Sequence, residues 1–242
     1  MTLHLPIQQL GVLLPPQQKL EDKFGGLPWG FPRERWPKCR HCNAPMNLLA
    51  QLSHHSRRLN LGKKGRILLA FQCDTAETCP NYEGGSGANA VVFQEADELG
   101  SGVTPAPHPE MTVYTETRVV RWRERARFSQ TETTLTGGRP HWFQNEEDPP
   151  PPWRFALQMQ FHYYFRGRVP SADELGCEVR RERSGKTVVE LPRATKIGAP
   201  YCVYADDKGW GVQTQLFGDS MIYLFVKTDK PTPEGWMVTQ ST

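Results

Sequence analysis

Short runs of apolar residues, many of them alternating with polar residues, recur along the chain between Gly, Pro, Asn and Asp residues. Runs of this kind are typical of β-strands joined by turns. The segment 1–23 is expected to form an extended arm followed by a helical turn at 17–23. Further along, the pattern predicts strands at residues 66–73, 90–94, 112–128, 154–165, 178–183, 187–191, 211–217 and 221–227.

Two segments interrupt this pattern. Residues 96–110 are rich in Gly and Pro, which favours a boundary between lobes. Residues 145–152 join acidic residues to four consecutive prolines, which cannot continue a central strand. We therefore predict a mainly β (β-rich α+β) fold with few short helices, in which internally repeated antiparallel sheets form one two-lobed unit. The predicted lobes are residues 1–105 and residues 106–242.

A turn motif recurs along the chain. Residues 23–29 read KFGGLPW, residues 135–142 read LTGGRPHW, and residues 196–201 read KIGAPY in a weaker third copy. Each copy precedes an apolar strand that contains glutamine. Gly permits positive φ and a close backbone approach, and Pro fixes the direction in which the chain leaves the turn. This order indicates internal repetition rather than three unrelated turns.

Composition excludes several classes of protein. Hydrophobic residues make up 38% and charged residues 23% of the 242 residues, as in folded chains rather than disordered ones. The 21 Gly and 21 Pro residues disfavour long helical bundles. The net charge of +3 does not by itself indicate nucleic-acid binding. The longest apolar runs, such as residues 67–71, are too short for a membrane span.

The start of the sequence lacks both a basic stretch and an apolar block, so no secretory signal is expected and the predicted location is cytoplasmic. Cysteines in that compartment are thiols or metal ligands rather than disulfides. Cys39 and Cys42 form a C-x2-C pair, and Cys73 and Cys79 form a second pair about thirty residues later. Four thiolates fit one closed tetrahedral zinc site with a structural role.

Two alternatives to this zinc site stay open. One of the histidines His41, His54 or His55 could replace one cysteine as a ligand. The second pair has five intervening residues instead of two, so the four thiols could also cluster without a metal.

The sequence also resembles a known superfamily, on motifs that include the Cys39–Cys42 pair. The other matching stretches are residues 24–29 (FGGLPW), 46–51 (MNLLAQ), 66–73 (RILLAFQC), 197–200 (IGAP) and 218–225. Together they resemble the Trus, YwqG and programmed-cell-death-protein-two superfamily, over about three fifths of the chain as judged by eye.

The resemblance implies a β-rich, internally duplicated binding domain without enzymatic activity. Eukaryotic members of the superfamily act as chaperones for a ribosomal protein, and bacterial members occur as immunity proteins that neutralise toxins, including nucleases. The cysteine ligands of the eukaryotic members correspond here to Cys39, Cys42, Cys73 and Cys79.

One predicted strand carries a row of arginines. Alternation places Arg121, Arg123, Arg125 and Arg127 on one face and Val120, Trp122, Ala126 and Phe128 on the opposite, core-facing side. Such a row suits recognition of carboxylates or phosphates. The alternative is an outward face paired with acidic residues of a neighbouring strand. Because no aromatic residues share the arginine face, an acidic protein surface is a better partner than RNA.

No arrangement of nucleophile, base and oxyanion donor occurs, so we expect a binding protein rather than an enzyme. The expected function is that of an immunity protein, with a secretion-delivered toxin, for example a nuclease, as partner. No membrane, nucleic-acid or small-molecule substrate is expected. Candidate contact residues besides the arginines are Trp142, Glu146, Glu147 and Asp148, with Trp29 and Trp210 if they are exposed. The alternative is a chaperone that binds a nascent or ribosomal polypeptide at an open sheet edge.

Overall fold

The structure, a computed structural model, describes most of the chain. The described residues are 2–75, 78–109, 111, 113–130, 133–149, 151–160, 162–166, 168–175, 180–181, 187–190, 202–205, 209–213 and 220–241. Within them, β-strands are joined by turns, with one short α-helix and three 3-10 turns. The predicted mainly β fold with few short helices is therefore confirmed.

Nine of the fifteen described strands overlap the predicted ranges. The fifteen strands are β1 (Leu3–Leu10), β2 (Lys23–Phe24), β3 (Asn47–Ser53), β4 (Arg66–Gln72), β5 (Asn89–Glu95), β6 (Thr117–Arg125), β7 (Leu135–Thr136), β8 (Arg154–Gln160), β9 (His162–Arg166), β10 (Arg180–Arg181), β11 (Thr187–Glu190), β12 (Cys202–Ala205), β13 (Gly209–Gln213), β14 (Ser220–Lys227) and β15 (Glu234–Ser241). The helical elements are η1 (Gly11–Leu13), η2 (Arg33–Arg35), η3 (Ala96–Glu98) and α1 (Ala172–Leu175).

The start of the chain differs from expectation. The predicted extended arm is a full strand, β1, in the middle of the main sheet, and no helical turn forms at residues 17–23. The pairing of Lys23 with Gln51 in β2 explains why the segment ends in extended backbone rather than in a helix. No helix in the described part of the chain is long and apolar enough to cross a membrane.

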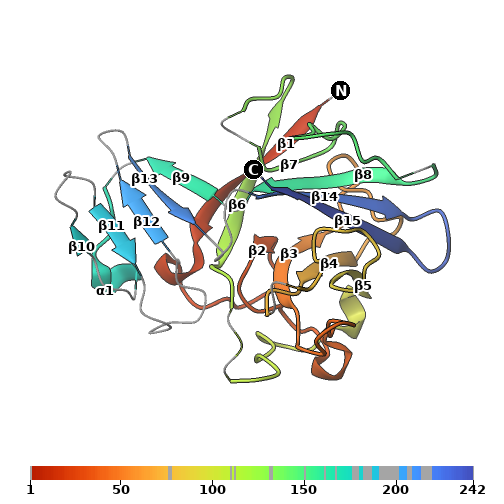
Figure 1. Ribbon diagram of the computed structural model, residues 1–242, viewed down its shortest axis with the longest axis horizontal. Helices are drawn as coiled ribbons and strands as arrows, with labels where there is room; N and C mark the ends of the chain where they lie inside the picture. The colour runs from red at the N-terminus through yellow and green to blue at the C-terminus, as the bar shows by residue number, and fades with distance from the viewer. Residues whose placement is uncertain are drawn as a thin grey trace.

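Ten strands form one antiparallel sheet that curls into a nearly closed barrel (Figure 1). The order across the sheet is β15-β14-β8-β7-β1-β6-β2-β3-β4-β5. The two outermost strands, β5 and β15, meet without a ladder of backbone hydrogen bonds. Asn89 Nδ2 instead donates to Met237 O at 3.4 Å, and the backbone of Gly235 packs against Val91. Side-chain contacts thus complete the closure of the barrel.

The sheet contains an internal duplication, as the turn motif predicts. Repeat 1 (β1 to β5) and repeat 2 (β6 to β8, β14 and β15) each contribute a long strand, a two-residue strand and a three-strand meander. The long strands are exchanged between the repeats, because β1 pairs with β7 of repeat 2 and β6 pairs with β2 of repeat 1. The sheet therefore joins strands from both sides of residue 105, and the division into lobes at that residue stays a prediction.

Matching details support the duplication. The glycine pairs Gly25-Gly26 and Gly137-Gly138 all have positive φ, between 64° and 78°. The short strand before each pair aligns with a buried glutamine, Gln51 in repeat 1 and Gln158 in repeat 2. Each glutamine Oε1 accepts a hydrogen bond from the backbone three residues after the glycine pair, from Trp29 N at 2.8 Å and from His141 N at 2.9 Å.

Even an irregularity recurs. In β3 the register skips Leu49, between Leu48 opposite Phe71 and Ala50 opposite Ala70. In β8 it skips Ala156, between Phe155 opposite Phe225 and Leu157 opposite Leu224. Both bulges lie at the same distance from the buried glutamine, so the two halves share one backbone plan.

The third predicted copy of the motif is not a repeat of this kind. Its turn, residues 196–201, lies outside the described residues. Its two strand segments lie in different sheets, residues 212–213 in β13 of a separate five-stranded sheet and residues 221–225 in β14 of repeat 2. The five-stranded sheet, ordered β10-β11-β12-β13-β9, is inserted between β8 and β14 (Figure 1).

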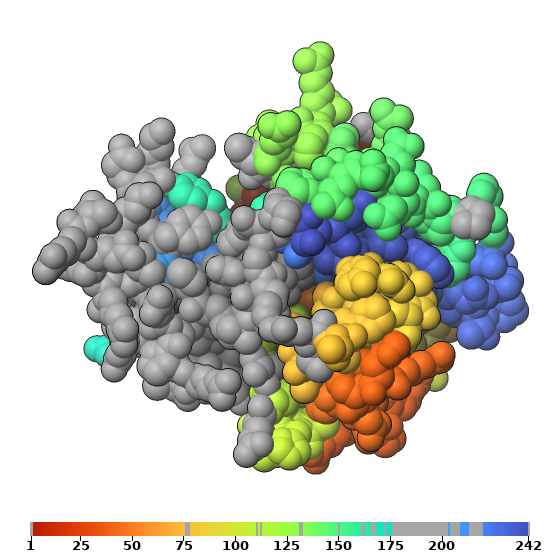
Figure 2. All heavy atoms as spheres, in the orientation of Figure 1, coloured from red at the N-terminus to blue at the C-terminus, as the bar shows by residue number. Residues whose placement is uncertain are grey.

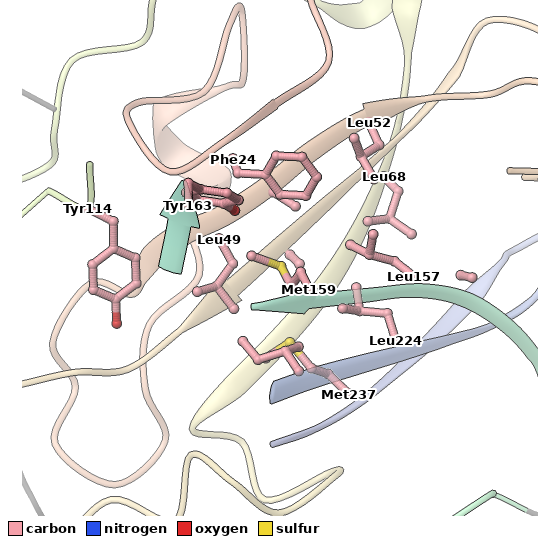
Figure 3. Packing of buried hydrophobic residues seen from close by; sticks show 14 of the residues in the cluster. Phe24, Leu49, Leu52, Leu68, Tyr114, Leu157, Met159, Tyr163, Leu224 and Met237 are labelled. Atoms are coloured by element: carbon pink, nitrogen blue, oxygen red, sulfur yellow. The ribbon is translucent and has the colours of Figure 1, made fainter. Parts of the chain in front are cut away.

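The interior of the barrel is the main hydrophobic core. It is shared by both repeats and includes Leu49, Leu68, Leu157, Met159 and Leu224 (Figure 3). The five-stranded sheet joins the same core through Tyr163, whose ring centroid lies 6.3 Å from that of Phe24, and through Val203, Trp210 and Val212. Residues of both repeats and of the inserted sheet thus pack in one core.

Each repeat also covers the outer face of its meander. In repeat 1, the segment between β2 and β3 packs Phe31, Trp36 and Met46 on Leu69 and Phe71. In repeat 2, Trp142 and Trp153 from the corresponding segment pack on the outer face of β14, which carries Tyr223 and Phe225. Figure 2 shows the surface where residues 78–88, in yellow, lie against the blue C-terminal strands. The segments that cover the two meanders hold half of the predicted site residues, namely Cys39, Cys42, Trp142, Glu146, Glu147 and Asp148.

Candidate functional site

The four cysteines of the predicted metal site lie together. Cys39 and Cys42 belong to the segment that covers the outer face of repeat 1, Cys73 follows β4, and Cys79 lies in the loop before β5. All four sulfur atoms lie within 4.8 Å of one another. The Sγ atoms of Cys39 and Cys79 are 3.7 Å apart, and those of Cys42 and Cys73 are 3.5 Å apart.

These distances fit one metal ion. A tetrahedral site with zinc–sulfur bonds of about 2.3 Å places its sulfur atoms about 3.8 Å apart. A disulfide needs a sulfur–sulfur distance of about 2.05 Å, so neither close pair is a disulfide. The described chain therefore brings four thiols into an arrangement that can hold a metal with no open coordination position.

The local backbone explains how the Cys39–Cys42 pair is shaped. The amide of His41 donates to Cys39 Sγ at 3.4 Å, and Cys39 N donates to Ala44 O at 2.9 Å. Asn43 closes this turn with φ of 59°, a left-handed conformation that Asn adopts more readily than most residues. Sequence reasoning did not single out Asn43, although an Asn directly after a C-x2-C pair is a signal for such a turn.

The thiols differ in burial and acidity. Cys39, Cys73 and Cys79 are buried, and Cys42 is the most exposed of the four. Burial acts to raise the pKa of the Cys39 thiol, but hydrogen bonds from the amides of Cys42 and His41 lower it to about 7. Burial raises the pKa of Cys73 to about 11 and raises that of Cys79 further. Cys39 thus loses its proton more readily than Cys73 and Cys79 do.

The histidines considered as alternative ligands do not join the cluster. His41 Nε2 lies 3.0 Å from Ser86 O. His54 Nδ1 accepts a hydrogen bond from Leu61 N at 3.0 Å, and His55 Nδ1 accepts from the amides of Arg57 and Arg58 at 3.3 Å. The group of potential metal ligands in the described chain contains only the four cysteines.

The arginine row lies on β6 and just beyond it. Arg121, Arg123 and Arg125 are paired across the sheet with residues 7, 5 and 3 of β1, so the three side chains share one face. Arg121 and Arg125 are exposed and Arg123 is half-buried, while Arg127 is exposed after the end of the strand. The paired residues of β1 are Ile7, Leu5 and Leu3, so this strand offers no acidic partner. Arg123 and Arg125 each interact with a further group of the protein.

The predicted core-facing side of this strand is wrong at two positions. The register places Gln8 opposite Val119 and Ile7 opposite Arg121, so Val120 lies in a bulge and is 50% exposed. Ala126 is exposed because β6 ends at Arg125 and the alternation stops there. Trp122 packs partly against the main core, as expected.

The remaining candidate contact residues lie in repeat 2. Trp142 is half-buried, with its ring centroid 4.3 Å from that of Tyr223. Glu146, Glu147 and Asp148 are exposed, and Glu147 Oε1 accepts a hydrogen bond from Gln240 Nε2 at 2.9 Å. Burial, and then the charge of Glu146, raises the pKa of Asp148.

The two other tryptophans differ from each other in exposure. Trp29 is half-buried, whereas Trp210 is 4% exposed and belongs to the main core, so it cannot anchor a partner. The candidate residues thus fall into three places: the cysteine cluster outside repeat 1, the arginine strand in the middle of the sheet, and the covering segment of repeat 2.

Comparison with known proteins adds no family to this picture. No family model matches the sequence, and no curated protein and no solved structure is similar to it. The resemblance to the superfamily of Trus and YwqG therefore stays a prediction.

Proposed function

We propose that this protein is a binding protein that neutralises a cognate toxin or effector by covering its active site. The observation that carries the proposal is the arginine-bearing stretch of β6, where Arg121, Arg125 and Arg127 are exposed along one short segment. Positive groups held on a paired strand attract an acidic partner surface and speed its encounter.

A second feature of β6 favours a protein partner. The exposed Val120 lies between Arg118 and Arg121 in the bulge, where it offers apolar contact beside positive charge. On the side away from β1, the described chain pairs β6 only with β2, at Thr117 and Arg118, and Asp22 O accepts from Val119 N at 2.9 Å. Beyond Val119, no described strand pairs with this edge.

We further propose that the cysteine cluster holds one zinc ion. The supporting observations are the sulfur–sulfur distances of 3.5 and 3.7 Å and the burial of three thiols against the outer cluster of repeat 1. Cys39, Cys42, Cys73 and Cys79 would hold the ion between the covering segment and β4. Such a closed site tethers loops and contributes folding free energy rather than activating water.

The zinc proposal is tested by metal analysis of untagged protein purified under reducing, chelator-free conditions. We expect about one zinc per chain in the wild type and a strong loss in the Cys42→Ser variant. Cys42 is chosen because it is the most exposed of the four thiols, so its replacement disturbs packing least. A wild-type protein that contains no zinc contradicts the proposal.

The binding function is tested by co-expression with each of the proteins encoded by the adjacent genes, with cell survival and co-purification as readouts. The variant Arg121→Glu with Arg125→Glu reverses two exposed charges of the row. We expect it to bind at least about tenfold more weakly, since the new carboxylates face an acidic partner surface and like charges across an interface cost several kcal/mol. The matched control Lys19→Glu with Lys64→Glu reverses two exposed charges elsewhere and is expected to protect like the wild type.

Full protection by the arginine variant would show that β6 does not take part in the interface. Failure of the wild-type protein to bind or protect would contradict the immunity function itself.

At residues 120–125, the edge of β6 away from β1 pairs with no strand among the described residues, which favours a chaperone as the second candidate function. A client polypeptide could add as a strand beside residues 120–125, with backbone hydrogen bonds as the main contact. A chaperone would bind extended, partly unfolded clients, and replacement of Val120 by proline would weaken this binding more than the arginine variant does. Binding of a folded toxin domain alone supports the immunity function instead.

A further inference from the structure

A cavity that shares only Asp148 with the candidate contact residues described above lies where the two repeats meet. Its volume is about 700 Å³, within the range of small-molecule pockets. Its walls come from residues 56–60 between β3 and β4, the glycine turn of repeat 2, the loop before β8, and one end each of β8 and β14. Tertiary structure alone brings these segments together.

Three arginines in the cavity wall have no carboxylate partner in the described chain. Arg57 and Arg139 are exposed and make no side-chain hydrogen bond or ion pair with a described residue. Arg154 is exposed and donates to two neutral acceptors, Asn60 O at 3.3 Å and Thr228 Oγ1. In contrast, Arg66 has a carboxylate partner, Glu95, at 2.8 Å.

A fourth arginine, Arg58, also lines the cavity, and its side chain is nine-tenths buried. Its Nη2 donates to Asp22 Oδ2 at 2.6 Å, but its buried Nη1 has no hydrogen-bond partner among the described residues. Asp148 is the one acidic residue among those that line the cavity. Positive charge therefore exceeds negative charge there.

Comparison of the repeats indicates that the fold does not require a positive charge at the position of Arg139. Arg139 occupies the position that Leu27 has in repeat 1, where Leu27 is buried in the outer hydrophobic cluster. In repeat 1 the amides of Gly25 and Gly26 donate to Leu49 O and Tyr114 O, both at 2.9 Å. The corresponding amides of Gly137 and Gly138, in the cavity wall, donate to no backbone carbonyl of the described chain.

From these observations we infer that the cavity binds a small polyanion, a molecule that carries two or more phosphate or carboxylate groups. Arg57, Arg139 and Arg154 contact the anionic groups, since the planar guanidinium pairs bidentately with either kind. The ligand is bound without chemical change. The site is independent of the proposed toxin-binding strand, because none of the row Arg121, Arg123, Arg125 and Arg127 lines the cavity.

The test is isothermal titration calorimetry of the full-length protein with pyrophosphate and, separately, with citrate. Binding of either probe at low salt, weakened at high salt, is the expected result. Stronger binding of pyrophosphate assigns the site to phosphates, and stronger binding of citrate assigns it to carboxylates. The variant Arg57→Gln with Arg139→Gln is expected to bind at least about tenfold more weakly, because it removes two guanidinium groups that form charge-assisted hydrogen bonds with the anionic groups.

The control Lys19→Gln with Lys64→Gln removes two exposed positive charges that do not line the cavity. It is expected to bind like the wild type, and both variants are expected to unfold at the wild-type urea midpoint because all four side chains are exposed. No binding of either probe overturns the inference. An equal loss in both variants, or no loss in the arginine variant, also overturns it.

Discussion

At the scale of single residues, the buried charges of this protein are matched by partners from distant segments. Lys23 is fully buried, and its Nζ lies 2.9 Å from Glu116 Oε2. The other carboxylate oxygen of Glu116, Oε1, lies 3.1 Å from Arg118 Nε. Burial lowers the pKa of Lys23, and Glu116 opposes this shift. Such pairs add little net stability when intact, but the loss of one partner is costly.

The pair of Asp22 and Arg58 allows a direct test of this cost. The Asp22 carboxylate accepts hydrogen bonds from Arg58 Nη2 at 2.6 Å and from Trp122 Nε1 at 2.9 Å, and both charged side chains are 10% exposed. We expect Asp22→Ala to lower the free energy of unfolding by about 3–5 kcal/mol, since it leaves the Arg58 charge buried and unpaired. Urea denaturation measures this loss.

The double variant Asp22→Ala with Arg58→Met serves as the control for that measurement. It removes both charges and is expected to recover part of the lost stability, so the two single changes should not add. Strict additivity of the two costs would contradict the coupling of the pair.

Histidine burial predicts loss of stability in weak acid. Burial is the largest cause that lowers the pKa of His4, His54 and His141 below the usual 6.5. Below pH 6.5 the unfolded chain therefore binds more protons than the folded chain, and the free energy of unfolding falls as the pH falls toward the folded pKa values. Well above pH 6.5 these groups are neutral in both states and the loss is absent.

Urea denaturation at pH 7.5, 6.5 and 5.5 measures this dependence. The His4→Gln variant is expected to lose less stability between pH 7.5 and 5.5 than the wild type, because His4 is 5% exposed and its proton uptake is removed. An identical pH profile for the two proteins would exclude a contribution from His4.

At the scale of elements, the glycine turns set how each repeat begins. Gly25 and Gly26 have φ of 64° and 69°, and a Cβ atom on Gly25 would lie 2.0 Å from Thr115 O in the backbone of the other repeat. Gly137 repeats this relation with Thr2 O at 2.8 Å. Each turn thus fits closely against the chain that enters the exchanged long strand, and only glycine allows that approach.

A pair of substitutions separates the two reasons for glycine at such positions, the positive φ and the close approach of neighbouring backbone. Gly102 has φ of 92° and open space around its Cβ position, so Gly102→Ala carries only the conformational cost, about 1–2 kcal/mol. Gly25→Ala adds a clash with backbone and is expected to cost about 3 kcal/mol or more. Thermal and urea unfolding compare the two variants. Equal costs would show that the close approach to Thr115 contributes nothing.

At the scale of the whole molecule, strand exchange makes the two repeats depend on each other. The edges of β1 are occupied by β6 and β7, both from the second half of the chain, while β6 pairs in turn with β2. The main core likewise contains residues of both repeats and of the inserted five-stranded sheet. Neither half has a complete sheet or core by itself.

We therefore expect residues 1–105 and residues 106–242, expressed separately, to remain largely unfolded. The two pieces expressed together should form a complex with the circular dichroism spectrum of the intact protein, because all sheet contacts are then available. Chemical-shift dispersion in NMR spectra gives a second readout. A stably folded fragment 1–105 would contradict this dependence and support a separable N-terminal lobe.

The fold class and much of the candidate site could be predicted from local features of the sequence. Alternating patterns located most strands, because side chains in a strand point to opposite faces with a period of two. The spacing of Cys39, Cys42, Cys73 and Cys79 predicted the thiol cluster, and the glycine pairs predicted the repeat. The bulge at Val120 was missed, since the insertion of one residue in a strand depends on its partner β1.

Local sequence patterns thus specified most of the segments that become strands, where the turns require glycine and which thiols can share one metal, because local backbone preference and short spacing govern these features. Three features were found only in the folded protein: the repeats exchange their first strands, the histidines lie away from the thiols, and Arg57, Arg139 and Arg154 line one cavity. These features depend on contacts between residues far apart in the chain, and such contacts are selected by burial of the common core rather than by any local pattern.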